Sequence, residues 1–128
     1  MSKRSDLMKE LTAVFNYWIK LKEANSNGMV RCFTCDKVCH ISGVDAGHFQ
    51  GSKKMATRWN EMNVKPQCRE CNSKENGMRE EFARRLDELY GYGTAEQIEL
   101  MSNTTKKISN SDLKDLIRYY QDSILSFS

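Results

Sequence analysis

The stretch that decides the fold is PQCRECNSKENG, residues 66–77, in which a CxxC pair of cysteines is followed at once by Asn72. An earlier stretch, CFTC at residues 32–35, repeats the CxxC spacing, with 32 residues between the two pairs. Two tight turns that each present two thiolates can surround one zinc ion, with Zn–S distances of ~2.3 Å. Since sulfur would fill every position, the sequence predicts a closed, structural zinc site. The four predicted ligands are Cys32, Cys35, Cys68 and Cys71.

Two other interpretations of the cysteines are weaker. A thioredoxin-like redox centre needs one CxxC in a βαβ setting, and that pattern is absent from the sequence. Four ordinary buried thiols would not require the doubled spacing. Cys39 is the fifth cysteine, and we expect it to be a small apolar residue in a strand rather than a ligand.

Length and charge limit the possible classes of protein. A chain of 128 residues corresponds to one domain, residues 1–128. The formal charge is +3; four thiolates subtract four charges and one Zn²⁺ returns two, which leaves +1. Net charge therefore says almost nothing about nucleic acid, and only local clusters of Lys and Arg are informative.

The expected compartment follows from the absence of long apolar segments. No run approaches eighteen apolar residues, and the start MSKRSDLMKEL lacks the apolar stretch of a secretion signal. We expect a cytosolic protein without a membrane partner. In that reducing compartment the cysteines are expected to bind metal rather than to form disulfides.

Apolar periodicity predicts an N-terminal helix within residues 1–28. Apolar residues recur at steps of three and four, Ser5 is a candidate N-cap, and Asn27-Gly28 is the expected stop. The predicted apolar face consists of Leu7, Leu11, Val14, Phe15, Trp18, Ile19 and Leu21.

Residues 29–91 are expected to form the zinc-bound centre. Short strands and turns are predicted to about Gln50, and a polar loop follows over residues 51–65. Pro66 should end regular strand pairing, because proline has no backbone N–H to donate. Asn72 should open a second helix that stops at Gly91. The predicted apolar face of this helical run is Phe82, Leu86, Leu89 and Tyr90.

Residues 92–128 are predicted to form the C-terminal helices. Thr94 to Gln97 resembles a capping box that opens a short helix through about Ser102. Ser109 or Ser111 could cap the last helix. The fold class is therefore α+β, with a small zinc-stapled centre flanked by N- and C-terminal helices.

A second candidate site lies between the cysteine pairs. Asp45 and His48 belong to a strand-like stretch, and Asn72 follows the last cysteine. An imidazole can take a proton from water near neutral pH. Carboxylate and carboxamide oxygens are hard ligands that suit Mg²⁺ or Mn²⁺. From these residues alone, a structural histidine is the favoured interpretation.

The order of these motifs resembles a known group of nucleases. A zinc knuckle precedes AGHF at residues 46–49, then RWNE at residues 58–61 with Asn63, and then Gln67 with a second knuckle followed by Asn72. This order resembles the ββα-metal or HNH superfamily and its endonuclease VII branch, and more closely the phage NinG (Rap) recombination endonuclease family. Gly77 and Tyr90-Gly91 also fit, and the resemblance spans residues 32–91.

The resemblance implies a metal-dependent DNA endonuclease that cleaves branched recombination intermediates such as Holliday junctions, D-loops and flaps. It implies an HNH-like ββα-metal fold, His48 as the general base, and Asn72 as a ligand of a catalytic Mg²⁺ or Mn²⁺. If the chain is phage-encoded, it would act in the cytosol of the bacterial host.

One position departs from the superfamily pattern. Many of those nucleases place Asp or His directly before the catalytic histidine as a metal ligand, whereas this chain has Gly47. Asp45 shares the strand parity of Gly47 and is the expected substitute. The rival ligands are Glu61, Asn60 and Asn63.

Basic residues beside this site predict contacts with DNA. Lys53, Lys54 and Arg58 could bind phosphates, which would position DNA without reading its sequence. A mixed, solvated surface is the alternative interpretation. Two other functions stay open: a plain HNH nuclease that nicks duplex DNA, and a zinc-dependent nucleic-acid-binding module without activity. A two-fold-symmetric junction would also suit a homodimer.

Overall fold

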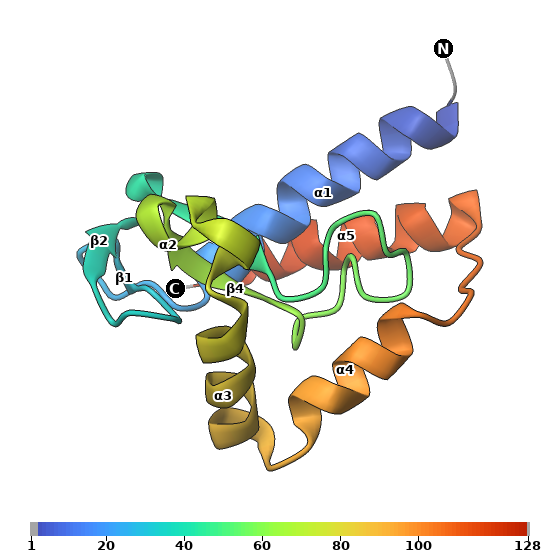
Figure 1. The fold of residues 1–128 in the computed structure, drawn as a ribbon. Coiled ribbons are helices and arrows are strands. Elements are labelled where there is room, and N and C mark those ends of the chain that lie inside the picture. Colours follow the sequence, from blue (N-terminus) through green and yellow to red (C-terminus); the bar gives the residue numbers. More distant parts are fainter. Residues whose placement is uncertain (1–2, 128) are drawn as a thin grey trace.

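The structure is a computed structural model and describes residues 3–127. Five helices and two small antiparallel sheets confirm the expected α+β class (Figure 1). No helix in the described range is long and apolar enough to cross a membrane. In chain order the elements are α1 (Lys3–Leu21), β1 (Met29–Arg31), β2 (Val38–His40), the 3₁₀ turn η1 (Ile41–Gly43), β3 (Val44–His48), β4 (Val64–Cys68), α2 (Arg69–Ser73), the 3₁₀ turn η2 (Glu75–Gly77), α3 (Arg79–Tyr90), α4 (Thr94–Ser102) and α5 (Asn110–Ser126).

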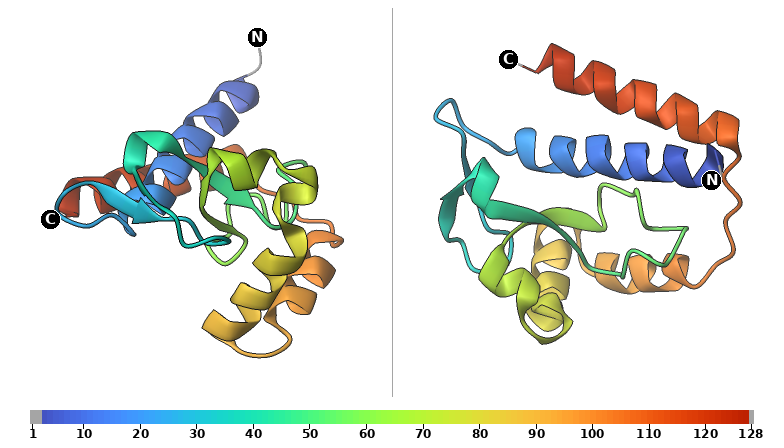
Figure 2. Two further views of the ribbon diagram at one scale, coloured as in Figure 1. Left: turned by 60° about the vertical axis from the view of Figure 1, so that its left-hand side comes forward. Right: turned by 90° about the horizontal axis from the view of Figure 1, so that it is seen from above.

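Helices α1 and α5 lie side by side and run in the same direction (Figure 2). The ring centroids of Phe15 and Tyr120 are 5.1 Å apart in an edge-to-face arrangement. Further along both helices, Trp18 and Phe127 repeat that arrangement at 5.9 Å. The predicted apolar face of α1 is confirmed, because Leu11, Phe15 and Ile19 are fully buried in this core.

The start and stop predicted for α1 are wrong. Ser5 lies inside the helix rather than at its N-cap. The helix ends at Leu21, before Asn27-Gly28, because a separate turn organises residues 25–29. In that turn the Asn25 side chain accepts hydrogen bonds from the backbone N–H groups of Asn27 and Met29.

Strands β3 and β4 form an antiparallel hairpin that contains Pro66, so the expectation that Pro66 ends strand pairing is wrong. Ala46 lies opposite Pro66 in the register. The Pro66 carbonyl accepts a hydrogen bond of 2.8 Å from the Phe33 N–H, on the side away from β3. The N and C=O of one strand residue project to the same side, so the missing N–H of Pro66 faces away from β3. Pro66 therefore removes no hydrogen bond between β3 and β4.

The two faces of this hairpin contact different parts of the protein. Side chains alternate along β3, so Ala46 and His48 share one face while Asp45 and Gly47 share the other. Ala46 packs against the core formed by α1 and α5. Asp45, on the opposite face, contacts residues of α2. The hairpin thus separates the helical core from the side on which α2 lies.

The predicted loop between β3 and β4 is held together by hydrogen bonds from a buried side chain of its own, that of Asn63. Asn63 is fully buried, and its Oδ1 accepts a 2.7 Å hydrogen bond from the Gln50 N–H. Its Nδ2 donates to the carbonyls of Gln50 and Thr57, at 3.0 and 3.1 Å. Trp59 in this loop joins the α1–α5 core. The loop is therefore held in one conformation against β3.

Helices α3 and α4 form a second, smaller core. Phe82 and Leu86 are buried there with Phe49 and Ile98, and Gly91 ends α3 as predicted. The other two residues predicted for this face differ, since Leu89 is 58% exposed and Tyr90 is 42% exposed. The apolar face of α3 is thus narrower than the sequence indicated.

The caps of the C-terminal helices agree with the prediction in one case of two. Ser109 and Asp112 form a capping box at the start of α5, as predicted for Ser109. The capping box predicted from Thr94 is wrong, because Gly93 is the N-cap of α4 and has a positive φ of 95°. Asp87 of α3 takes over the role, and its Oδ1 accepts a 2.8 Å hydrogen bond from the Ala95 N–H.

Candidate functional site

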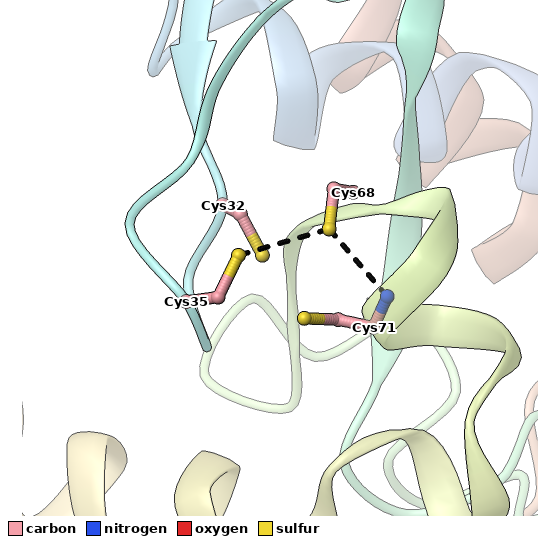
Figure 3. A group of neighbouring side chains, drawn as sticks. All are labelled: Cys32, Cys35, Cys68 and Cys71. Carbon is pink, nitrogen blue, oxygen red and sulfur yellow. Dashed lines mark hydrogen bonds between the residues drawn. The ribbon is translucent and has the colours of Figure 1, made fainter.

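The four predicted zinc ligands converge in space (Figure 3). One pair comes from the turn between β1 and β2, and the other from the junction of β4 and α2. Their sulfur atoms all lie within 4.8 Å of one another. The Sγ atoms of Cys35 and Cys68 are 3.8 Å apart, which matches the edge of about 3.8 Å in a tetrahedron with Zn–S bonds of ~2.3 Å. The cluster fits a structural zinc ion.

The electrostatics of the cluster also favour a cation. Burial works against ionisation of Cys32, but hydrogen bonds from the Thr34 hydroxyl and from nearby backbone amides outweigh it, and the pKa of Cys32 falls to about 6. Burial raises the pKa of Cys71 above its ordinary value. A divalent cation is what would allow all four thiols to ionise together.

Two residues beside the cluster are not part of it. Cys39 lies in β2 and packs against the cluster without joining the four sulfurs, as predicted. His40 uses its Nδ1 to accept a hydrogen bond from the Ser42 N–H at 3.2 Å. Its ring therefore caps η1, on the surface of the first knuckle.

The side chain of Asp45 on β3 contacts the side chain of Asn72 on α2. The Asn72 Nδ2 donates a hydrogen bond of 3.1 Å to the Asp45 Oδ2. The other carboxylate oxygen lies 3.6 Å from the Arg69 Nε. A carboxylate beside a carboxamide is a donor set that fits Mg²⁺ or Mn²⁺, but a cation bound there has to share Asp45 with Arg69.

Asn72 does not open a helix, and that prediction is wrong. It is the fourth residue of the five-residue α2, which begins at Arg69 directly after Cys68. Cys68 itself caps this helix, and its sulfur accepts from the Cys71 N–H at 3.5 Å. Consecutive helical residues diverge by about 100°. The Cys71 thiol accordingly points into the sulfur cluster while Asn72 reaches towards β3.

His48 is held by the loop between β3 and β4. Its Nε2 donates to the Arg58 carbonyl at 3.2 Å, so in the neutral ring the free lone pair is on Nδ1. Burial lowers the pKa of His48 below its ordinary value; the Arg58 and Ala46 carbonyls oppose the shift, and the positive charge of Arg58 adds to it. His48 is therefore neutral at pH 7, the form in which an imidazole can accept a proton.

The structure brings Asp45 and Asn72 together and leaves His48 apart from them. Among the side chains that the structure describes, no hydrogen bond joins His48 to either residue. Alternation along β3 places Asp45 and His48 on opposite faces of the hairpin. His48 is, however, the last residue of β3, and β3 is paired along one edge only within the described sheet.

The rival ligands have other partners. Glu61 forms an ion pair of 3.0 Å with Lys22. The Asn60 Oδ1 accepts from the Met62 N–H at 2.8 Å. Asn63 is fully buried and uses its side chain to order the loop. Of the acids and amides named from the sequence, only Asp45 and Asn72 face each other.

The predicted DNA-binding residues lie on the loop beside His48. Lys53 and Lys54 are exposed, and the Lys54 Nζ donates to Asn103 at 3.0 Å. Arg58 is half-buried, with its guanidinium 5.0 Å from the centre of the Trp59 ring. Arg58 therefore acts on His48 twice, through the hydrogen bond to its carbonyl and through the effect of its charge on the pKa of His48.

Gln67 belongs to the motif that carries the family resemblance, but no role was predicted for it from the sequence; it is a fully buried polar residue of this region. Its Nε2 donates to the Thr34 Oγ1 at 3.1 Å and to the Gly77 carbonyl at 2.9 Å. Its Oε1 is buried without a partner among the described atoms. Apart from its place in that motif, the position next to a cysteine ligand and opposite Asp45 carried no signal of this role.

A family model, that of the bacteriophage lambda NinG protein, matches residues 1–127. The chain belongs to the NinG family. No curated protein and no solved structure matches it. The family match extends beyond the resemblance of residues 32–91, since it includes the helices at both ends. In this NinG-family chain the paired helices α1 and α5 are thus part of the matched unit.

Proposed function

We propose that this NinG-family chain is a metal-dependent endonuclease that cleaves branched DNA formed in recombination. The observation that carries the proposal is the meeting of Asp45 and Asn72, 3.1 Å apart, directly beside a four-cysteine cluster. The cluster fixes α2 against the hairpin, and α2 in turn presents Asn72 to the strand that bears His48.

The proposed roles follow from the chemistry of each group. Asp45 and Asn72 would hold Mg²⁺ or Mn²⁺, which supplies charge stabilisation at the phosphate when bound. Sites with one or two protein ligands complete their coordination with substrate phosphate and water. His48, neutral at pH 7, would take the proton from the attacking water.

The placement of these groups sets a requirement on the substrate. Asp45 and His48 lie on opposite faces of β3, so the scissile phosphate has to be reached from both faces. The proposal therefore places it across the edge of β3 that is not paired with β4, near the end of the strand at His48. A splayed or branched strand reaches such an edge more readily than a continuous duplex does.

The test is cleavage of labelled four-way junction, flap and linear duplex by zinc-loaded protein, with Mg²⁺, with Mn²⁺ or with neither. We expect metal-dependent cutting of the branched substrates in preference to the linear one. Equal nicking of all three would favour a plain duplex nickase. Binding to junctions without cutting, in any divalent metal, would favour a binding module without activity.

A further inference from the structure

We propose that a groove along α1 binds the phosphate backbone of a DNA arm; the proposal rests on the DNA substrate of the proposed function and adds a contact outside the reacting groups. The groove is open to solvent and has a volume of about 380 Å³. It is lined by Arg4, Ser5, Met8, Lys9 and Arg58.

The groove carries positive charge that no acid neutralises. Three of its five lining residues are cationic, and none is acidic. Among the side chains that the structure describes, no carboxylate oxygen lies within 4.0 Å of the charged atoms of Arg4, Lys9 or Arg58. Arg84 and Arg85, by contrast, both bind Glu81 at 2.7 Å. The positive charges of the groove are thus not neutralised by a carboxylate among the described side chains, and they can attract phosphate.

Arg58 connects this groove to the proposed site. Its backbone carbonyl accepts the hydrogen bond from His48, and its guanidinium lies 3.5 Å from the Thr12 Oγ1 on α1. The Trp59 ring supports the guanidinium and also donates to Thr12, at 3.2 Å. One ordered residue therefore borders both sites, so a strand that passes His48 can continue along α1.

The parallel packing of α1 and α5 adds to the positive potential. The N-terminal ends of both helices lie together, where the Arg4 Nη1 donates to Asn110 at 3.2 Å. The side chain of Lys3 lies beside Lys114 and lowers the pKa of Lys114. Helix N-termini carry partial positive charge, and two of them lie together here, although Asp6 and Asp112 in their first turns offset part of that charge. A phosphate backbone bound near these helix ends would relieve the repulsion between Lys3 and Lys114.

The shape of the groove indicates backbone contact rather than base recognition. It is open to solvent and lies between α1 and Arg58 of the β3–β4 loop, with Ser5 as its one uncharged polar lining residue, so it offers few groups that could read base edges. Arg and Lys on an open surface bind phosphates irrespective of sequence. We infer that the groove holds a duplex arm next to the cleaved branch.

The experiment measures DNA binding as a function of salt for zinc-loaded protein, without added Mg²⁺ or Mn²⁺. The probe is a fluorescent four-way junction, and the variant is Arg4→Ala with Lys9→Ala. The matched control is Lys20→Ala with Arg118→Ala, which removes the same two charge types from α1 and α5 outside the groove. Thermal melts of both variants verify that the fold is retained.

We expect the slope of log affinity against log salt to become shallower by about 2 in the groove variant, since each lost phosphate contact contributes about 0.9. The control should keep a slope close to that of the wild type. A groove variant with the wild-type slope, or a wild-type protein that does not bind the junction, would overturn the proposal. Failure of cleavage with Mg²⁺ would instead count against the nuclease function alone.

Discussion

The side chain of Gln67 fills the space that a Cβ atom on Gly47 would occupy. Such a Cβ would overlap the Gln67 Oε1 and lie 2.6 Å from its Cδ. Gln67 is anchored on the other side by Thr34, whose hydroxyl lies 3.5 Å from the Cys32 sulfur. The residue before His48 is therefore glycine for a steric reason. The same glutamine connects the strand of His48 to the cysteine cluster.

Replacing Gly47 by alanine should destabilise the fold strongly. The new methyl group displaces a fully buried side chain and breaks its hydrogen bonds to Thr34 and Gly77. Overpacking and the loss of buried hydrogen bonds together predict a loss of about 2–4 kcal/mol in the free energy of unfolding, measured by denaturant titration.

The matched control for this change is Gly43→Ala. A Cβ at Gly43 has no neighbour within 4 Å, so this variant should unfold like the wild type. Combining Gly47→Ala with Gln67→Ala should cost less than the sum of the two single changes, because the overlap disappears. Equal stability of Gly47→Ala and Gly43→Ala would show that Gln67 does not occupy this space.

Local sequence signals predicted the parts of this structure that depend on one segment. The cysteine cluster followed from spacing, and the Ser109 cap of α5 followed from neighbouring residues. Pro66 was misread because its tolerance depends on which edge of β4 its nitrogen faces, and that edge follows from the register with β3, while the distant Phe33 binds the Pro66 carbonyl at the other edge. The cap of α4 was misread for the same reason, since Asp87 supplies it from α3.

In the candidate site, too, the features set by one segment were predicted, and those set by distant residues were not. Sequence order identified Asp45 and Asn72, which do meet, because a ligand knuckle followed by a short helix limits where the next side chain can point. It did not reveal that the ring of His48 is held by the Arg58 carbonyl. Nor did it reveal the role of Gln67, which comes from Thr34, Gly47 and Gly77 meeting around it in space.

Removing one cysteine ligand should unfold the centre of the protein. Purified protein is expected to contain about one zinc per chain, and Cys68→Ser should lose the zinc together with cooperative unfolding, because zinc binding contributes directly to folding free energy. Elemental analysis and thermal melts measure both. Cys39→Ser is the control, since Cys39 packs against the cluster without belonging to it. Folded, active wild-type protein without zinc would contradict this prediction.

Replacing His48 by alanine should abolish cleavage and leave junction binding intact. The proposed general base is lost, whereas the phosphate contacts of Lys53 and Lys54 remain. His40→Ala is the control, because His40 is the other histidine of the chain and caps η1 on the zinc knuckle. Near wild-type cleavage rates in His48→Ala would remove His48 from the mechanism.

The rate of cleavage should depend on pH in a way that follows from burial of His48. Its pKa lies below the ordinary value of 6.5, so the neutral base is formed already in mildly acidic solution. We expect a rate that is level near pH 7 and falls with an acidic midpoint below 6.5. Because the unfolded chain binds this proton more readily, stability should also decrease as pH falls through about 6.5. An acidic midpoint above 6.5 would contradict the assignment of this limb to His48.

Cys71 and Asn72 are neighbours in sequence, and their variants should lose different properties. We expect loss of zinc and structure in one and loss of cleavage alone in the other. Cys71 is buried in the sulfur cluster, so Cys71→Ala should lose zinc and structure first and activity as a consequence. Asn72 is exposed, and its recorded side-chain contact is the hydrogen bond to Asp45. Asn72→Ala should therefore melt like the wild type and retain its zinc, yet lose most cleavage at low Mg²⁺.

The position of Arg69 sharpens this last test. Arg69 lies 3.6 Å from the carboxylate of Asp45 and would compete with a cation for it. If Asp45 and Asn72 hold the divalent ion, Arg69→Ala should lower the Mg²⁺ concentration needed for half-maximal cleavage, and Asn72→Ala should raise it. Metal titrations of cleavage on both variants, beside zinc analysis, measure these opposite shifts. Normal cutting by Asn72→Ala at low Mg²⁺ would show that Asn72 is not a ligand, whatever its contact with Asp45.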